Sequence, residues 1–279
     1  MLKKAYLEIT NACNLRCSFC HGTKRPTKYL SIEEFTLAAT KLRNVTEYLY
    51  FHLMGEPLLH PQLPKFFDIA SKLGFKVILT TNGTLLPQKA ACLLAARPLH
   101  KVSISLHSYE ANDIGISLDA YLAGCFDFCA AAAQKGIIAV MRLWNQGGAD
   151  KLNTPILEAM HRAFPGEWVQ TRSGFRLADR VFLEWGEKFD WPDENADYVG
   201  STHTCYGLRD QIGILSNGTI VPCCLDAEGG IPLGNIFTDD VESVLASPRA
   251  VALKRSFENR NITEELCLRC GYAGRMVKK

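Results

Sequence analysis

The chain has 279 residues, of which 47% are hydrophobic, 10% aromatic and 22% charged. These values are ordinary for a folded globular protein and exclude a disordered, collagen-like or low-complexity chain. With 31 basic and 29 acidic residues, the formal net charge is +2. That balance provides no electrostatic basis for a nucleic-acid or membrane-surface partner. No apolar run approaches the roughly 18 residues that span a bilayer, and Glu8 interrupts the first apolar stretch, so we expect neither a membrane span nor a signal peptide.

Cysteine is the unusual component, because the chain has 11, an odd number. In the absence of an export signal we expect a cytoplasmic, reducing location, where disulfides are rare. Metal sites or catalytic thiols are therefore the better interpretation of these cysteines.

The first 175 residues or so alternate apolar, β-branched runs with helical patterns. Strands are predicted at residues 5–9, 48–53, 75–81, 101–106 and 137–143, with a sixth candidate at 168–171. Helices are predicted between them at residues 31–42, 65–73, 87–96, 118–135 and 154–164. Ser31 and Glu34 have the spacing of a capping box, and Gly74 and Gly136 each follow a helical pattern as helix-ending residues.

This alternation predicts an α/β fold with a parallel sheet and right-handed crossovers. Eight such units would close a TIM barrel, but only about six fit before the pattern changes. We therefore expect a partial (β/α)6 TIM-like barrel. Catalytic groups in such folds gather at the carboxyl ends of the strands.

The pattern changes after about residue 185. Residues 211–215 and 219–221 flank Ser216-Asn217-Gly218, which is a hairpin signal. A helical stretch follows at 239–257, interrupted near Pro248. We expect a small C-terminal α+β domain, with the chain divided into residues 1–185 and 186–279.

The first cysteine cluster is Cys13, Cys17 and Cys20, in the loop directly after the first predicted strand. Three thiolates spaced C-x3-C-x2-C can bind three irons of a [4Fe–4S] cluster and leave the fourth iron open. Two alternatives are a structural zinc site completed by His21 and three unrelated buried cysteines.

The motif, with aromatic Phe19 before Cys20, closely resembles that of the radical S-adenosylmethionine (SAM) superfamily. Gly55-Glu56-Pro57 after the second strand resembles the motif by which this family binds the amino group of SAM. Other polar residues near strand ends are placed like the family's SAM-binding side chains: Thr80, Asn82, Ser103, Ser105 and Arg142. The alternative for Thr80, Ser103 and Ser105 is that they make only local hydrogen bonds.

The resemblance implies a [4Fe–4S] cluster that chelates SAM. It also implies an external one-electron reductant, such as flavodoxin or ferredoxin, that starts the cleavage of SAM to a 5′-deoxyadenosyl radical. That radical abstracts hydrogen from an unactivated carbon. The protein's task is to position that carbon and to exclude water and oxygen.

The second cysteine cluster has the pattern C-x12-G-x4-C followed by C-x2-C. It resembles the C-terminal region of SPASM/twitch enzymes, and the absence of cysteines after Cys270 favours the shorter twitch form with one auxiliary [4Fe–4S] cluster. The resemblance assigns its four ligands as Cys205, Cys223, Cys267 and Cys270. A four-cysteine zinc site is the alternative, and Cys224 could replace Cys223 as ligand.

Cys224 is then left over. Adjacent strand residues point to opposite faces, so Cys224 would face away from a cluster bound by Cys223. In epimerases that this layout resembles, such a free cysteine returns a hydrogen atom to the substrate radical; the alternative is a small buried residue. We expect Cys92, Cys125 and Cys129, all in predicted helices, to pack in the core.

Two fates of the substrate radical compete: epimerisation, with Cys224 as hydrogen donor, and dehydrogenation, with an electron passing to the auxiliary cluster. The resemblance implies a small sugar-like or aminocyclitol-like substrate, or a peptide. An alternative is a maturase that forms a new bond in a peptide or protein. A non-catalytic iron–sulfur carrier or zinc scaffold is a hypothesis of another class, but it would have no need for Gly55-Glu56-Pro57.

Overall fold

The computed structural model describes residues 1–273 and has one curved sheet of eleven strands. Six consecutive neighbours in this sheet run parallel, in the order β1-β2-β3-β4-β5-β8. Their bounds are β1 Lys4–Leu7, β2 Tyr48–Tyr50, β3 Lys76–Thr81, β4 Leu99–Ser105, β5 Ile138–Gln146 and β8 Val181–Glu187. The predicted α/β fold with a partial six-stranded barrel is thereby confirmed.

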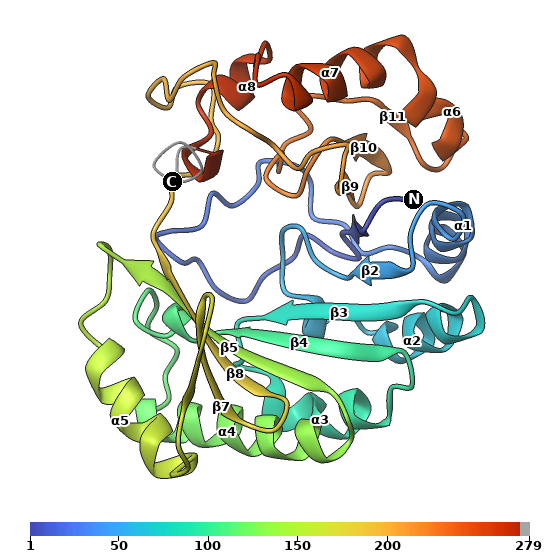
Figure 1. The fold of residues 1–279 in the computed structure, drawn as a ribbon. Helices are drawn as coiled ribbons and strands as arrows, with labels where there is room; N and C mark the ends of the chain where they lie inside the picture. The colour runs from blue at the N-terminus through green and yellow to red at the C-terminus, as the bar shows by residue number, and fades with distance from the viewer. Residues whose placement is uncertain (274–279) are drawn as a thin grey trace.

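Five helices connect the strands and lie on the outer side of the sheet (Figure 1). They are α1 Ile32–Leu42, α2 Leu63–Lys72, α3 Leu86–Ala95, α4 Leu118–Gln134 and α5 Asn153–Ala163, and two short 3-10 turns follow β2 and β4 at Pro57–Leu59 and Leu106–Ser108. The capping box at the start of α1 is present, because Ser31 Oγ accepts from the Glu34 N–H and Glu34 accepts from the Ser31 N–H. Gly74 and Gly136 adopt positive φ angles just after α2 and α4, as predicted.

Apolar side chains fill the space between helices and sheet. Phe35 of α1 stacks on Phe66 of α2 with 4.1 Å between ring centroids. Cys125 and Cys129 share one face of α4 and are fully buried, which confirms their packing role; Cys92 packs against the same core and is half-buried.

The sixth barrel strand differs from the prediction. Residues 168–171 were predicted to supply it, but Val169–Thr171 form β6, a fully exposed edge strand that pairs antiparallel with β7 (Gly174–Ala178). The parallel position beside β5 is taken by β8 instead. The physical reason is burial: β8 places Val181 and Leu183 in the core, whereas β6 has no buried residue.

The C-terminal region extends the same sheet. β9 (Gln211–Ile214) pairs parallel with β1, and β10 (Thr219–Val221) and β11 (Gly234–Asn235) follow antiparallel. Three helices, α6 Val241–Ala246, α7 Pro248–Glu258 and α8 Glu265–Leu268, complete this region, which stands above the barrel in Figure 1. The division at residues 185 and 186 stays a prediction; β8 ends two residues beyond it, at Glu187. Among the helices of residues 1–273, none combines the length and apolar character that crossing a bilayer requires.

Candidate functional site

The first three cysteines lie in the long loop that leaves the carboxyl end of β1. Each sulfur has an N–H donor nearby: Cys13 from the Leu15 backbone at 3.5 Å, and Cys20 from the Gly22 backbone at 3.4 Å. Cys17 accepts from the Asn112 side chain at 3.1 Å. Such donors stabilise thiolates, the form in which cysteine binds metal. Asn112 lies 95 residues from Cys17 in the chain, so no local motif points to it.

Burial raises the pKa of all three thiols, and the N–H donors oppose this effect only in part. A positively charged metal core would reverse that direction by stabilising the thiolates. Three thiols in one loop, each next to an N–H donor, therefore fit the predicted cluster. Within residues 1–273, no group of three or more His, Cys, Asp or Glu side chains is arranged to hold a single metal ion.

Gly55-Glu56-Pro57 packs directly against this cysteine loop. Glu56 donates its backbone N–H to the Ala12 carbonyl at 2.7 Å, and a Cβ on Gly55 (φ +79°) would collide with the Thr10 carbonyl oxygen. The buried Glu56 carboxylate accepts backbone N–H groups from Leu58 at 3.1 Å and from Asn82 at 2.7 Å. Burial raises the pKa of this carboxyl to about 7, although those hydrogen bonds lower it.

Glu8 and Arg25 form a buried junction below the cysteine loop. The guanidinium donates to both carboxylate oxygens, at 2.8 and 2.9 Å, and Glu8 is fully buried. The carboxylate also accepts the Ser216 and Met54 N–H groups, at 3.0 and 3.1 Å, and Arg25 donates to the Ala227 carbonyl at 2.9 Å. Sequence reasoning recognised Glu8 only as a break in an apolar stretch, although an acid inside a buried strand is itself a signal that a buried cation is nearby.

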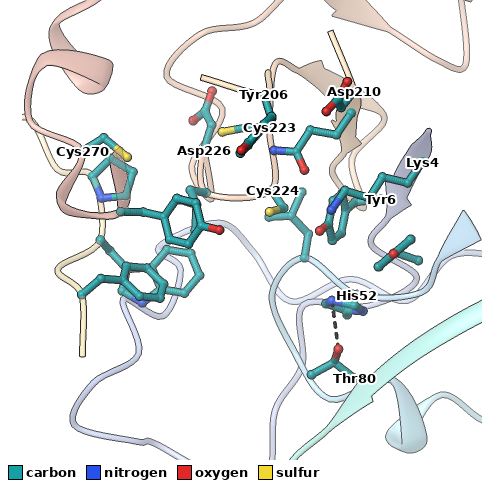
Figure 2. Close-up of a pocket in the computed structure, with 18 of the residues that line it drawn as sticks. Lys4, Tyr6, His52, Thr80, Tyr206, Asp210, Cys223, Cys224, Asp226 and Cys270 are labelled. Carbon is teal, nitrogen blue, oxygen red and sulfur yellow. Dashed lines mark hydrogen bonds between the residues drawn. The ribbon is translucent and has the colours of Figure 1, made fainter. Parts of the chain in front are cut away.

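A cavity of about 860 Å³ lies between the inner face of the barrel and the C-terminal region (Figure 2). Among the predicted SAM-binding residues, Phe19, Thr80, Ser105 and Arg142 line it. Others lie outside the lining in the part of the chain that the structure describes: Gly55, Glu56, Pro57, Asn82 and Ser103.

The strand-end side chains have different partners. Thr80 Oγ1 lies 3.1 Å from His52 Nε2 and 3.5 Å from the Arg142 guanidinium, and Arg142 Nε donates to Glu184 at 3.1 Å. Asn82 donates to the Asn14 side chain in the cysteine loop at 2.9 Å. The buried Ser103 hydroxyl has no hydrogen-bond partner among residues 1–273. Burial, with the nearby Arg142 and Lys4 charges, lowers the pKa of His52 to about 3, so this ring is neutral.

The second cysteine cluster lines the same cavity from the C-terminal side, with Cys205, Cys223, Cys267 and Cys270 all contributing. Burial raises the pKa of each thiol, to about 11 for Cys270. Cys224 and then the other three cysteines raise the pKa of Cys223 further, so all five lie close together. Cys205 also accepts the Gly207 N–H at 3.3 Å. This all-sulfur set fits the predicted auxiliary cluster.

Cys224 lies next to this set but also has neighbours on the barrel strand β1. Burial raises its pKa, whereas a hydrogen bond from the Tyr6 hydroxyl and the nearby Lys4 ammonium lower it. Figure 2 shows Cys224 beside Tyr6 and Lys4 of β1, and Cys223 beside Tyr206. Sequence reasoning did not identify Lys4 or Tyr6, because the first residues of a strand carry no motif.

Two family models match this chain. Residues 7–125 match the radical SAM superfamily, and residues 205–271 match the SPASM iron-sulfur cluster-binding domain. These ranges contain the first and second cysteine clusters, respectively.

Curated relatives match part of the chain. One is a probable GTP 3′,8-cyclase of Aeropyrum pernix, 34% identical over 117 residues, which are 38% of this chain and 32% of the relative. Another, from Pyrococcus furiosus, is a tungsten-containing aldehyde ferredoxin oxidoreductase cofactor-modifying protein, 30% identical over 131 residues, which are 44% of this chain and 36% of the relative. The chain thus spans about a third of the length of such relatives.

Solved structures share the fold over nearly the whole chain. BtrN in complex with AdoMet (SAM) and 2-DOIA has a TM-score of 0.63 at 14% identity, covering 97% of this chain and 93% of BtrN. The protein anSMEcpe with bound AdoMet and the Kp18Cys peptide has a TM-score of 0.66 at 14% identity, covering 99% and 94%. Streptococcus suis SuiB bound to precursor peptide SuiA has a TM-score of 0.60 at 14% identity, covering 98% and 70%.

Proposed function

The chain belongs to the radical SAM superfamily and carries a SPASM domain, and we propose that it cleaves SAM reductively and abstracts a hydrogen atom from a substrate in the cavity. The observation that carries this proposal is the position of the cavity. Phe19 of the first cysteine loop and all four cysteines of the second cluster line the same 860 Å³ space. A substrate there would have the SAM site on one side and the auxiliary cluster on the other.

The cofactors implied by the two domains are SAM and iron–sulfur clusters. We propose that Cys13, Cys17 and Cys20 hold a [4Fe–4S] cluster with one open iron, and that Cys205, Cys223, Cys267 and Cys270 hold the auxiliary cluster. Bound SAM, after transfer of one electron from flavodoxin or ferredoxin, supplies the 5′-deoxyadenosyl radical. Gly55-Glu56-Pro57 would position the amino group of SAM, because its backbone is hydrogen-bonded to the start of the cysteine loop.

The remaining proposed SAM contacts divide by location. Thr80, Ser105, Arg142 and Phe19 are available at the cavity wall, whereas Asn82, which follows β3, donates to Asn14 in the cysteine loop. Arg142 is bound to Glu184. To pair with the SAM carboxylate it would have to share its guanidinium between two carboxylates, which its five N–H donors permit.

We propose epimerisation as the reaction, with Cys224 returning the hydrogen atom. Cys224 adjoins the proposed ligand Cys223 but has Tyr6 and Lys4 as neighbours of its own. Burial raises the pKa of its thiol, which favours the protonated form that a hydrogen-atom donor needs. Return of the atom would leave a sulfur radical, which one electron and one proton from the reductant and solvent would restore. Dehydrogenation, with Cys224 as a bystander, is the competing outcome.

The substrate class follows from the same cavity. About 860 Å³ accommodates a small molecule or a short peptide segment. The similar structures contain both kinds of molecule: 2-DOIA in BtrN, and peptides in anSMEcpe and SuiB. A sugar-like or aminocyclitol-like molecule and a peptide both fit the proposal.

The first test is anaerobic reconstitution. If both clusters have four irons, the protein should hold about eight irons per chain and should form 5′-deoxyadenosine from SAM with dithionite. Zinc at the first site, or no cleavage of SAM by a protein with full iron content, would contradict the proposal.

The second test addresses Cys224. In D₂O, wild-type protein should place one deuterium at the inverted carbon of the product, since the thiol hydrogen exchanges with solvent. Cys224→Ala should abolish that product. Cys92→Ala is the control, because Cys92 is a half-buried cysteine on α3, outside the cavity lining. An unchanged product from Cys224→Ala would exclude the donor role.

A further inference from the structure

Lys4 occupies an unusual position among the charged groups of the cavity. It is the first residue of β1, its side chain is half-buried, and it lines the cavity. The ammonium lies 5.3 Å from the ring centroid of Tyr6 and 5.2 Å from that of Tyr50, which is cation–π distance. In residues 1–273 its side chain has no ion-pair or hydrogen-bond partner.

The acidic groups near Lys4 already have other partners. Glu184 is bound by Arg142 at 3.1 Å and by Lys101 at 3.6 Å. Asp210 is bound by Lys3 and by Arg209, each at 3.1 Å.

Asp226, another acid of the lining, accepts the Gly230 and Ile231 N–H groups at 2.7 and 2.9 Å, and burial raises its pKa. On the barrel wall, Lys101 and Arg142 share the Glu184 carboxylate, whereas Asp210, the carboxylate that acts on Lys4, is already paired with Lys3 and Arg209. The barrel wall therefore carries an excess positive charge, and Lys4 is the residue that carries it.

Burying an ammonium without a partner is costly, since the charged form loses hydration. Burial accordingly lowers the pKa of Lys4, and the Arg142 charge lowers it further, whereas Cys224 and Asp210 oppose this. An anion beside the ammonium would remove that cost. The two tyrosine rings stabilise the ammonium by cation–π attraction but supply no negative charge to balance it.

We propose that Lys4 binds an anionic group of the substrate, a carboxylate or a phosphate, on the barrel wall next to Cys224. This deepens the proposed function and rests on it, because it names the substrate as an anion and places one end of it. Tyr6 links the two residues, with its ring beneath the ammonium and its hydroxyl bonded to Cys224 (Figure 2). A substrate held at Lys4 would therefore present a neighbouring carbon to the Cys224 sulfur.

The anion is distinct from the carboxylate of SAM. The cysteine loop leaves β1 after Leu7, whereas Lys4 begins the strand. With a rise of about 3.3 Å per residue, the two ends are about 10 Å apart. The Gly55-Glu56-Pro57 motif packs against the loop end, and Lys4 belongs to the other end. Among the proposed SAM contacts, Arg142 extends toward Lys4, since its charge lowers the pKa of that ammonium, so the competition with SAM described below is needed to separate the two anions.

The test is calorimetric titration of the reconstituted, full-length protein with inorganic phosphate and, separately, with acetate. It requires neither turnover nor SAM, so its outcome is independent of whether SAM is cleaved. We expect one equivalent of one probe to bind wild-type protein. Lys4→Gln should weaken binding at least about tenfold, which corresponds to about 1.4 kcal/mol. Lys4→Arg should retain most of the affinity, because it keeps the positive charge.

Lys3→Gln is the matched control, since Lys3 is the adjacent cation but is exposed and paired with Asp210; it should bind like wild type. Four outcomes would overturn the proposal: no binding of either probe to wild type, equal binding by Lys4→Gln, equal loss in Lys3→Gln and Lys4→Gln, or loss in Lys4→Arg as large as in Lys4→Gln. A fifth is displacement of the probe by SAM, which would assign Lys4 to the cofactor. The probe that wild-type protein binds with the higher affinity indicates whether the substrate carries a phosphate or a carboxylate.

Discussion

Replacing Glu8 by alanine removes the carboxylate that joins the two cysteine-bearing regions. Arg25 belongs to the loop of the first cluster, whereas Ser216 and Ala227 flank Cys223 and Cys224 in the second. The Arg25 side chain is only 9% exposed. The substitution therefore leaves a buried guanidinium without its counter-ion.

The magnitude follows from the contacts that are lost. Breaking a buried, bidentate ion pair by removing one partner costs about 3–5 kcal/mol. The Ser216 and Met54 N–H groups also lose their acceptor, at about 1–3 kcal/mol each if water does not replace it. These contributions overlap, so we expect a loss of about 4 kcal/mol in the free energy of unfolding, which is a large fraction of a typical total.

Urea unfolding of anaerobically prepared protein, followed by circular dichroism, measures this loss, and iron analysis reports on both clusters. Arg249→Gln is the control: its ion pair with Glu264 is exposed on the arginine side (55%), so the loss should be under about 1 kcal/mol. The double variant Glu8→Met/Arg25→Met should be more stable than Glu8→Ala, since no charge is left buried alone. A loss below about 1 kcal/mol for Glu8→Ala would refute the reasoning.

Three further predictions concern the two clusters. Cys205→Ser should lower the iron content from about eight to about four per chain, whereas Cys92→Ser should not change it; equal iron in both variants would contradict the ligand role. Glu56 has its pKa raised to about 7 by burial. The folded state therefore holds a proton that the unfolded state releases between pH 4.5 and 7, and stability falls as pH rises through that window. Between pH 6 and 7.5, SAM-free wild type should lose about 1 kcal/mol more than Glu56→Gln in urea unfolding; parallel pH profiles would exclude this. Gly55→Ala should lower the unfolding midpoint further than Gly115→Ala, because both have positive φ but only Gly55 lies against backbone atoms; equal losses would show that the contact with the cysteine loop is unimportant.

Local patterns predicted most of the barrel. Helices and strands at 31–42, 75–81 and 118–135 differ from the structure by a residue or so at each end, because amphipathic periodicity, caps and terminal glycines act over a few residues. The prediction of the sixth barrel strand was wrong because it depends on distant contacts. Residues 168–171 have a strand-like composition, but packing against β5 decides which strand is buried. The pairing of β9 with β1 joins residues more than 200 positions apart, which no local pattern encodes.

The sequence by itself determined the family, because Cys13, Cys17 and Cys20 lie within eight residues and Gly55-Glu56-Pro57 is a contiguous motif. Only the tertiary structure decided that Phe19 of the first cysteine loop and the second cysteine cluster line one cavity. It placed Tyr6 and Lys4 beside Cys224, and Glu8 and Arg25 between the two cysteine regions. The physical reason is that charge compensation and hydrogen bonding act through space. The role of a buried carboxylate or an unpaired ammonium can be inferred only when its neighbours in space are known.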